Sequence, residues 1–150
     1  MAVKINMWEK GKTWKLELEG GALFGKSLSE VVPGKMIKSE LDGYEFKITG
    51  GSDFAGFPLT EEIEGIGLKR SLLKQGDLGF TGKAKGGRLS KGVRRRKTLR
   101  GKTIAETTAQ VNMIVVKSGS KKFEEIFPEQ NQPKVKAEEK KVEEKPAEGS

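Results

Sequence analysis

The chain has 150 residues, a formal net charge of +8 and no cysteine or histidine. Without these two residue types it can form no disulfide, no thiolate metal site, no cysteine nucleophile and no Ser-His arrangement. The composition therefore argues against enzymes in general, and most strongly against hydrolases of the triad or zinc type.

The amino-terminal residues have no apolar run after a basic start, so they do not resemble a signal peptide. No stretch approaches the roughly 18 consecutive apolar residues that a membrane-spanning helix needs. We therefore expect a soluble, intracellular protein that does not enter a membrane.

Three segments alternate apolar and polar residues with a period of two, which predicts strands with one buried and one solvated face. They are residues 3–7, 14–18 and 44–48. Asp42-Gly43, directly before the third segment, predicts a tight turn. Residues 111–116 are apolar on nearly both faces, which predicts the central and most buried strand, ended by Gly119.

Helix signals are few. Residues 26–32 are predicted to form one or two helical turns before Pro33-Gly34 ends them, and residues 71–74 another short turn. The 20 glycines and frequent turn dipeptides suit short strands joined by tight turns. We therefore predict a mainly β fold, a small antiparallel β-barrel-type domain.

Residues 20–27 (Gly-Gly-Ala-Leu-Phe-Gly-Lys-Ser) match the phosphate-loop pattern of nucleotide-binding proteins. The context opposes a nucleotide site, because the preceding strand alternates instead of forming a continuous apolar run. Pro33-Gly34 also breaks the following helix, and no later strand ends in an aspartate that could hold the metal. We interpret the match as an accidental one in a glycine-rich turn.

Two aromatic residues follow the third strand among glycines. Phe54 and Phe57 could stack on nucleic-acid bases or close the end of a small barrel. We favour the core position for Phe57 and leave both roles open for Phe54.

The positive charge is confined to one window. Residues 69–102 carry 13 basic and 1 acidic side chain, whereas the rest of the chain carries 16 basic and 20 acidic ones. A solvated charged face usually mixes both signs, so this segregation indicates a polyanionic partner. Glycines in the window let the backbone approach a phosphate chain closely, and arginines offer paired donors to phosphate oxygens. We therefore predict a long basic loop that binds RNA through Lys69, Arg70, Lys74, Lys83, Lys85, Arg88, Lys91, Arg94, Arg95, Arg96, Lys97, Arg100 and Lys102.

The carboxy-terminal segment differs in composition. Residues 128–150 contain three prolines, mixed charges and no aromatic residue, so they cannot bury enough apolar surface to order. We predict one domain over residues 1–127 and a disordered charged tail over residues 128–150.

The chain also resembles a known family, on sequence blocks that occur in the family's order. The blocks are residues 47–53, 56–58, 95–101, 104–112 and 115–119, and the resemblance covers about residues 1–127. The family is that of the small-subunit ribosomal protein eS-six, shared by archaea and eukaryotes. Its eukaryotic members continue into a long, basic, phosphorylated extension, so the short tail here indicates an archaeal-type form.

The resemblance implies a structural constituent of the small ribosomal subunit in the cytoplasm. It implies contacts with ribosomal RNA and neighbouring ribosomal proteins, without catalysis or a cofactor. Two other interpretations stay open: a free β-barrel protein that binds RNA or DNA outside the ribosome, and a small nucleotide hydrolase that uses residues 20–27.

Overall fold

The computed structural model describes residues 2–19, 21–81, 92–119, 121–128 and 130. Its elements, in chain order, are β1 (Ala2–Glu9), β2 (Lys12–Glu19), β3 (Val31–Pro33), the 3₁₀ turns η1 (Gly34–Met36) and η2 (Ser39–Leu41), β4 (Glu45–Asp53), β5 (Leu68–Lys74), β6 (Arg94–Arg100), β7 (Thr108–Lys117) and α1 (Phe123–Ile126). The mainly β prediction is confirmed. None of the helices in the described part of the chain is long and apolar enough to cross a membrane.

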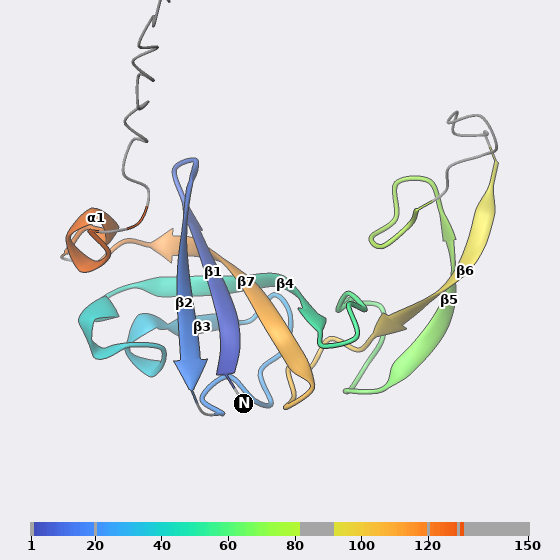
Figure 1. Cartoon of the computed structure of the whole chain (residues 1–150), viewed down its shortest axis with the longest axis horizontal. Coiled ribbons are helices and arrows are strands. Elements are labelled where there is room, and N and C mark those ends of the chain that lie inside the picture. Colours follow the sequence, from blue (N-terminus) through green and yellow to red (C-terminus); the bar gives the residue numbers. More distant parts are fainter. Residues whose placement is uncertain (1, 20, 82–91, 120, 129, 131–150) are drawn as a thin grey trace, which may run out of the picture.

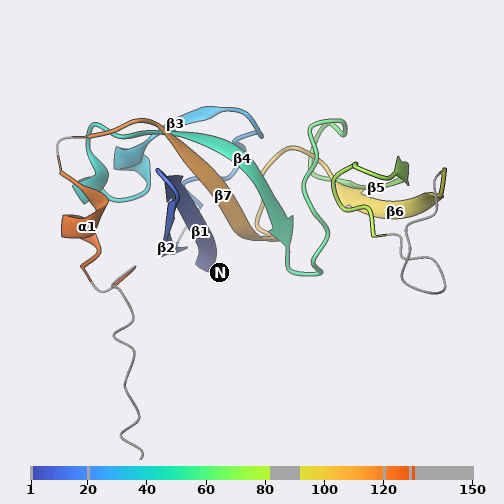
Figure 2. The ribbon, with the colours of Figure 1, turned by 90° about the horizontal axis from the view of Figure 1, so that it is seen from above.

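Five strands form one sheet in the order β2-β1-β7-β4-β3, and β7 lies in its centre as predicted (Figure 1). The β1–β7 pair is parallel, and the other pairs are antiparallel. Figure 2 shows the same sheet from above. The order has two ends, β2 and β3, so the described strands form an open sheet and not a closed barrel.

The hydrophobic core lies on one face of this sheet. The alternation of β1 buries Val3, Ile5 and Met7, and that of β4 buries Phe46 and Ile48. These positions confirm the strands predicted from the period-two pattern. The sequence run along β7 is different, because Val111 and Met113 are buried whereas Ile114 and Val116 are exposed. Only one face of this central strand is covered.

The helix α1 closes one end of the core and was not predicted. Its Phe123 is buried and stacks on the Trp14 ring, with 4.8 Å between ring centroids. The Tyr44 ring is tilted against the Phe123 ring, with 4.7 Å between the two centroids. The Tyr44 hydroxyl donates a hydrogen bond to the Lys121 carbonyl oxygen at 2.5 Å. This aromatic cluster holds a helix of four residues that could not form alone.

Two predicted helical turns are wrong. Residues 26–30 form turns and a bridge, and residues 31–33 form β3, which pairs with β4. Residues 71–74 belong to β5, because pairing with β6 determines their backbone. The Asp42-Gly43 turn is confirmed, with Gly43 at φ +83°.

The strands β5 and β6 form a separate antiparallel ribbon (called the ribbon below). It pairs from Leu68↔Arg100 to Lys74↔Arg94 without a bulge. Both views place it to one side of the five-stranded sheet (Figures 1 and 2). The basic segment, predicted as a loop, is therefore partly built from regular strands. The predicted loop centre at residues 82–91 and the predicted tail beyond residue 130 lie outside the described residues.

Candidate nucleic-acid interface

A buried ion pair fixes the base of the ribbon to the sheet. The Arg100 Nε donates to Asp53 Oδ2 at 2.8 Å, and the exposed fractions of the two side chains are 13% and 1%. A further guanidinium nitrogen of Arg100 donates to the Ile66 carbonyl oxygen at 2.9 Å. Because Asp53 ends β4 and Arg100 ends β6, this pair sets where the ribbon leaves the sheet.

Backbone contacts reinforce this junction. The Arg100 N–H donates to the Pro58 carbonyl at 3.0 Å, and the Thr60 N–H donates to the Arg100 carbonyl at 3.0 Å. At Gly101 a Cβ atom would lie 2.1 Å from the Gly65 carbonyl oxygen, so a larger residue would push away the backbone that precedes β5. The junction is therefore closely packed as well as ion-paired.

The ribbon has a small hydrophobic core of its own. Ile63, Leu73 and Leu99 are buried together, and Phe80 packs against them. Because cross-strand partners share a face, the register places Leu73 and Leu99 on one face of the ribbon. The Ile63 and Phe80 side chains cover that face.

The same register defines the other side, the open face. It carries two leucines that are about half exposed, Leu68 (51%) and Leu72 (55%). It also carries four exposed cationic side chains: Arg70, Lys74, Arg94 and Arg96. Along each strand these positions alternate with the positions of the covered face. The covered face carries Lys69, Arg95 and Lys97.

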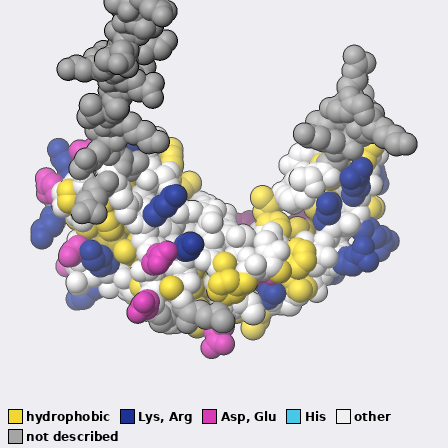
Figure 3. Space-filling view, in the orientation of Figure 1, with side chains coloured by type: hydrophobic (Ala, Val, Ile, Leu, Met, Phe, Trp, Pro, Cys, Tyr) yellow, Lys and Arg dark blue, Asp and Glu magenta, His cyan; other side chains and the backbone are white. Residues whose placement is uncertain are grey.

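No acidic residue interrupts either strand of the ribbon. The acid nearest along the described chain, Asp77, accepts the Lys74 backbone N–H at 2.8 Å in the turn after β5. In Figure 3 the arm formed by β5 and β6 carries dark blue side chains with few magenta ones, whereas both colours are mixed over the five-stranded sheet. The ribbon is thus a region of one charge sign beside a body of mixed charge.

The predicted site residues divide into three groups. The structure brings seven of them together on the ribbon: Lys69, Arg70, Lys74, Arg94, Arg95, Arg96 and Lys97. It turns Arg100 toward Asp53, and Lys102 pairs with Glu64 at 3.2 Å. Lys83, Lys85, Arg88 and Lys91 lie outside the described residues.

The aromatic residues near the junction lie outside both hydrophobic clusters. Phe57 is only partly buried, so the favoured core position is wrong, and Leu59 is the fully buried residue there. The backbone N–H of Phe57 donates to Asp53 Oδ1 at 2.7 Å. Phe54 is 57% exposed and is therefore available to a partner.

In the phosphate-loop match, the chain's own groups accept hydrogen bonds from the N–H groups of residues 24–27 and from the Lys26 ammonium. The Gly25 and Leu28 N–H groups donate to the Ile104 and Lys102 carbonyls at 2.9 and 3.0 Å. The Ser27 N–H donates to Glu30 Oε2 at 3.0 Å, and Lys26 Nζ lies 2.5 Å from Glu30 Oε1. These donors are therefore not available to a phosphate. The expectation that no later strand ends in an aspartate is wrong, because β4 ends in Asp53, but that carboxylate is paired with Arg100.

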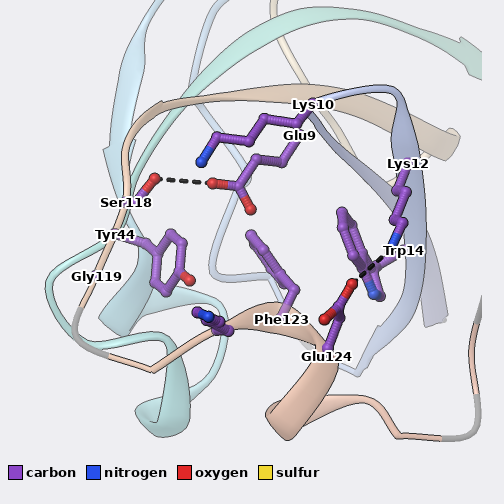
Figure 4. A pocket seen from close by; sticks show the side chains of 10 residues that line it. Glu9, Lys10, Lys12, Trp14, Tyr44, Ser118, Gly119, Phe123 and Glu124 are labelled. Carbon is purple, nitrogen blue, oxygen red and sulfur yellow. Dashed lines mark hydrogen bonds and ion pairs between the residues drawn. The ribbon is translucent and has the colours of Figure 1, made fainter.

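A hollow of about 420 Å³ lies between the β1–β2 turn and α1 (Figure 4). The rings of Trp14 and Phe123 form part of its wall, and the Lys12–Glu124 ion pair crosses its rim at 2.5 Å. The carboxylate of Glu9 accepts a hydrogen bond from the Ser118 hydroxyl at 2.8 Å. In the described part of the chain, no three acidic side chains gather as a metal site would require.

Sequence reasoning missed the Asp53–Arg100 pair and the two faces of the ribbon. The basic side chains at 94–97 occupy both faces of β6, so no period-two pattern marks this strand. The sequence carries no signal for the pair, because Asp53 lies 47 residues before Arg100 and other acids, Glu61, Glu62 and Glu64, stand closer to the basic segment.

Comparisons with known proteins agree with this architecture. The family model described as ribosomal protein S6e matches residues 1–128. A Methanococcus maripaludis protein named "Small ribosomal subunit protein eS6" is 43% identical over 122 residues, covering 80% of this chain and 91% of the relative. Proteins of the same name from Methanobrevibacter smithii and Archaeoglobus fulgidus are 40% and 38% identical over 128 residues, covering 85% and 83% of this chain and 93% of each relative.

These three relatives are archaeal, which agrees with the archaeal-type form expected from the sequence. The matched family is one of structural ribosomal proteins and not of enzymes, so the expectation of a non-catalytic protein is confirmed by the family. The chain belongs to the ribosomal protein S6e family.

Proposed function

We propose that this protein is a structural constituent of the small ribosomal subunit that binds ribosomal RNA through the ribbon. Its relatives are named as proteins of that subunit. In this role it supports translation in the cytoplasm, beside neighbouring ribosomal proteins, by stabilising folded RNA. No reaction and no cofactor are part of the proposal.

The observation that carries the proposal is the open face of the ribbon. Arg70 and Lys74 lie on β5 beside Arg96 and Arg94 on β6, and all four are exposed. Four adjacent cations repel one another unless a polyanion neutralises them, and phosphate oxygens are suitable acceptors for arginine. The exposed leucines of the same face, Leu68 and Leu72, can contact ribose and base surfaces.

The shape of the ribbon adds to this argument. A two-stranded ribbon that projects from a rigid body can reach between RNA helices, where phosphate contacts set orientation without reading sequence. The buried Asp53–Arg100 pair holds the ribbon's base, so we assign Arg100 a positioning role. Lys83, Lys85, Arg88, Lys91 and Lys102 remain proposed RNA contacts.

A binding measurement with two matched variants tests the proposal. The ribbon variant replaces Arg70, Lys74, Arg94 and Arg96 with Gln, and the body control replaces Lys10, Lys35, Lys121 and Lys122 with Gln. The two variants have the same net charge. Affinity for purified small-subunit ribosomal RNA is measured over a series of salt concentrations.

We expect the slope of log affinity against log salt to become shallower by about 3 in the ribbon variant, because four phosphate contacts are lost. The body control should keep the wild-type slope. Equal slopes in both variants would show that binding follows total charge and not the ribbon. Equal affinity of the wild type for an unrelated duplex DNA would favour the alternative of a free nucleic-acid-binding protein.

A further inference from the structure

The outer face of the five-stranded sheet, opposite the hydrophobic core, carries an exposed tryptophan. The register aligns one row of outward side chains across the strands: Thr13, Trp8, Ile114, Lys47 and Val31. In this row Trp8 is 46% exposed, Val31 48% and Ile114 37%. A large aromatic ring that remains half exposed in the middle of a sheet offers a flat surface for stacking.

Three amide side chains from the next two rows of the same face lie together and are called the amide row below. Asn6 pairs with Asn112 across β1 and β7, and Asn6 Nδ2 donates to Asn112 Oδ1 at 3.0 Å. Gln110 Nε2 donates to the same oxygen at 2.9 Å. This arrangement leaves the Asn112 amide nitrogen, Asn6 Oδ1 and Gln110 Oε1 without a hydrogen-bond partner among the described residues. Donor and acceptor groups thus lie together on this partly buried amide row.

A hollow of about 270 Å³ lies beside this amide row. Its lining includes Glu17 and two exposed lysines, Lys4 and Lys15, which form no ion pair with any of the described residues. With two lysines and one glutamate, the lining of the hollow has a net positive charge. Asn6 and Trp8 are two residues apart on one strand, so the amide row and the indole are about 7 Å apart.

We propose that this face binds an unpaired nucleotide of an RNA strand. The base stacks on the Trp8 ring, its edge exchanges hydrogen bonds with the free amide groups of Asn112 and Gln110, and the flanking phosphates lie near Lys4 and Lys15. This is a second RNA contact on a different element from the ribbon. It shares with the proposed function only the assumption that RNA is the partner.

The chemistry of the face favours RNA over a protein partner. A protein covering this face would have to bury the row of amides and the adjacent lysines, which costs free energy unless each group finds a partner. A nucleobase has a flat apolar surface and an edge of donors and acceptors, which matches an indole beside an amide row. Its phosphates match the lysines.

Tryptophan fluorescence can locate the binding event. The chain has two tryptophans, and Trp14 is buried at 3% exposure, so a stacking partner on this face should quench Trp8 alone. The experiment titrates a single-stranded RNA nonamer of mixed sequence into the full-length ribbon variant, whose ribbon contacts are removed. We expect quenching that disappears in Trp8→Phe, whose remaining emission comes from Trp14.

Affinity is measured by the anisotropy of the same nonamer carrying a fluorescein label. Asn112→Asp keeps an oxygen acceptor for Asn6 and Gln110 but removes the amide donor and adds a negative charge, so binding should weaken about tenfold. Trp8→Ala should weaken binding about tenfold or more, through lost stacking. Gln75→Ala, an exposed amide on the ribbon turn, is the matched control and should change nothing.

Two results would overturn this proposal. One is unchanged Trp8 emission in the presence of RNA, and the other is equal affinity of Asn112→Asp and the control. If wild-type protein still binds ribosomal RNA through the ribbon in that case, only the second site fails. If the ribbon does not bind ribosomal RNA but the nonamer still quenches Trp8, the proposed function is wrong and this second site is supported.

Discussion

The five-stranded sheet and the ribbon differ in how they are stabilised. The sheet buries a large continuous cluster that includes Ile5, Phe46 and Phe123, whereas the ribbon buries Ile63, Leu73 and Leu99 beside Phe80. An isolated two-stranded ribbon is marginally stable in water, so the ribbon depends on its own small cluster and on the junction at Arg100. The sheet is the rigid support, and the ribbon is the exposed basic arm.

This contrast agrees with the distribution of charge. The sheet region mixes acids and bases, whereas both ribbon strands lack acids and carry adjacent cations. Like charges on neighbouring strands destabilise a ribbon. The ribbon therefore combines low intrinsic stability with a surface that a polyanion would neutralise, which is the arrangement expected of an element that completes its ordering on RNA.

The largest expected effect is on the sheet core. Phe46→Ala removes a ring that is fully buried, and it should lower the free energy of unfolding by about 4 kcal/mol, measured by urea denaturation. All amides, including those of the ribbon, should then exchange faster with solvent. A loss of protection confined to the ribbon would contradict the role of the sheet as support.

The second largest loss of stability is expected from breaking the junction between the sheet and the ribbon. Asp53→Ala leaves the Arg100 guanidinium with a buried unpaired charge, and the free energy of unfolding should fall by about 3 kcal/mol. The double variant with Arg100→Leu as well should recover part of that loss, because the unpaired charge is gone. Purely additive effects of the two substitutions would show that the ion pair does not couple sheet and ribbon.

A smaller and local effect is expected inside the ribbon. Leu73→Ala opens its small cluster and should cost about 2 kcal/mol. Hydrogen exchange should speed up at β5 and β6 amides while β1 and β7 amides keep their protection. Leu72→Ala, on the open face, is the matched control and should leave exchange unchanged. Faster exchange throughout the sheet would mean that the two regions unfold together.

The smallest effect concerns the turn that resembles a phosphate loop. The Lys26 ammonium, followed by the Ser27 N–H, lowers the pKa of Glu30 below its ordinary value of 4.5. Since the folded state favours the charged form, this pair stabilises the fold above that value, and the contribution is lost as the pH falls through the lowered pKa. Lys26→Ala should raise the pKa of Glu30 in an NMR titration, with little change in stability because both side chains are more than a third accessible to solvent. An unchanged pKa of Glu30 in that variant would contradict the effect assigned to Lys26.

The sequence predicted the sheet better than the ribbon. Period-two alternation identified β1, β2 and β4, because a single buried face leaves a clear pattern there. It failed for residues 71–74, where tertiary pairing with β6 overrides local preference. It also failed for α1, a single turn held by aromatic contacts that are distant in sequence.

The site was predicted in charge but not in geometry. Counting charges located the basic window, yet the division into an open and a covered face depends on the β5–β6 register. The inward position of Arg100 depends on Asp53, 47 residues earlier in the chain. No local pattern encodes such a contact, and so Arg100 was grouped with the surface cations.

Sedimentation with small ribosomal subunits tests the central claim most directly. Tagged wild type, the ribbon variant and the body control are expressed in the same archaeal cells, and lysates are separated on low-salt sucrose gradients. We predict that wild type and the body control migrate with the small subunit and that the ribbon variant, folded by circular dichroism, stays at the top. Equal migration of all three with the subunit would contradict the assignment of RNA binding to the ribbon.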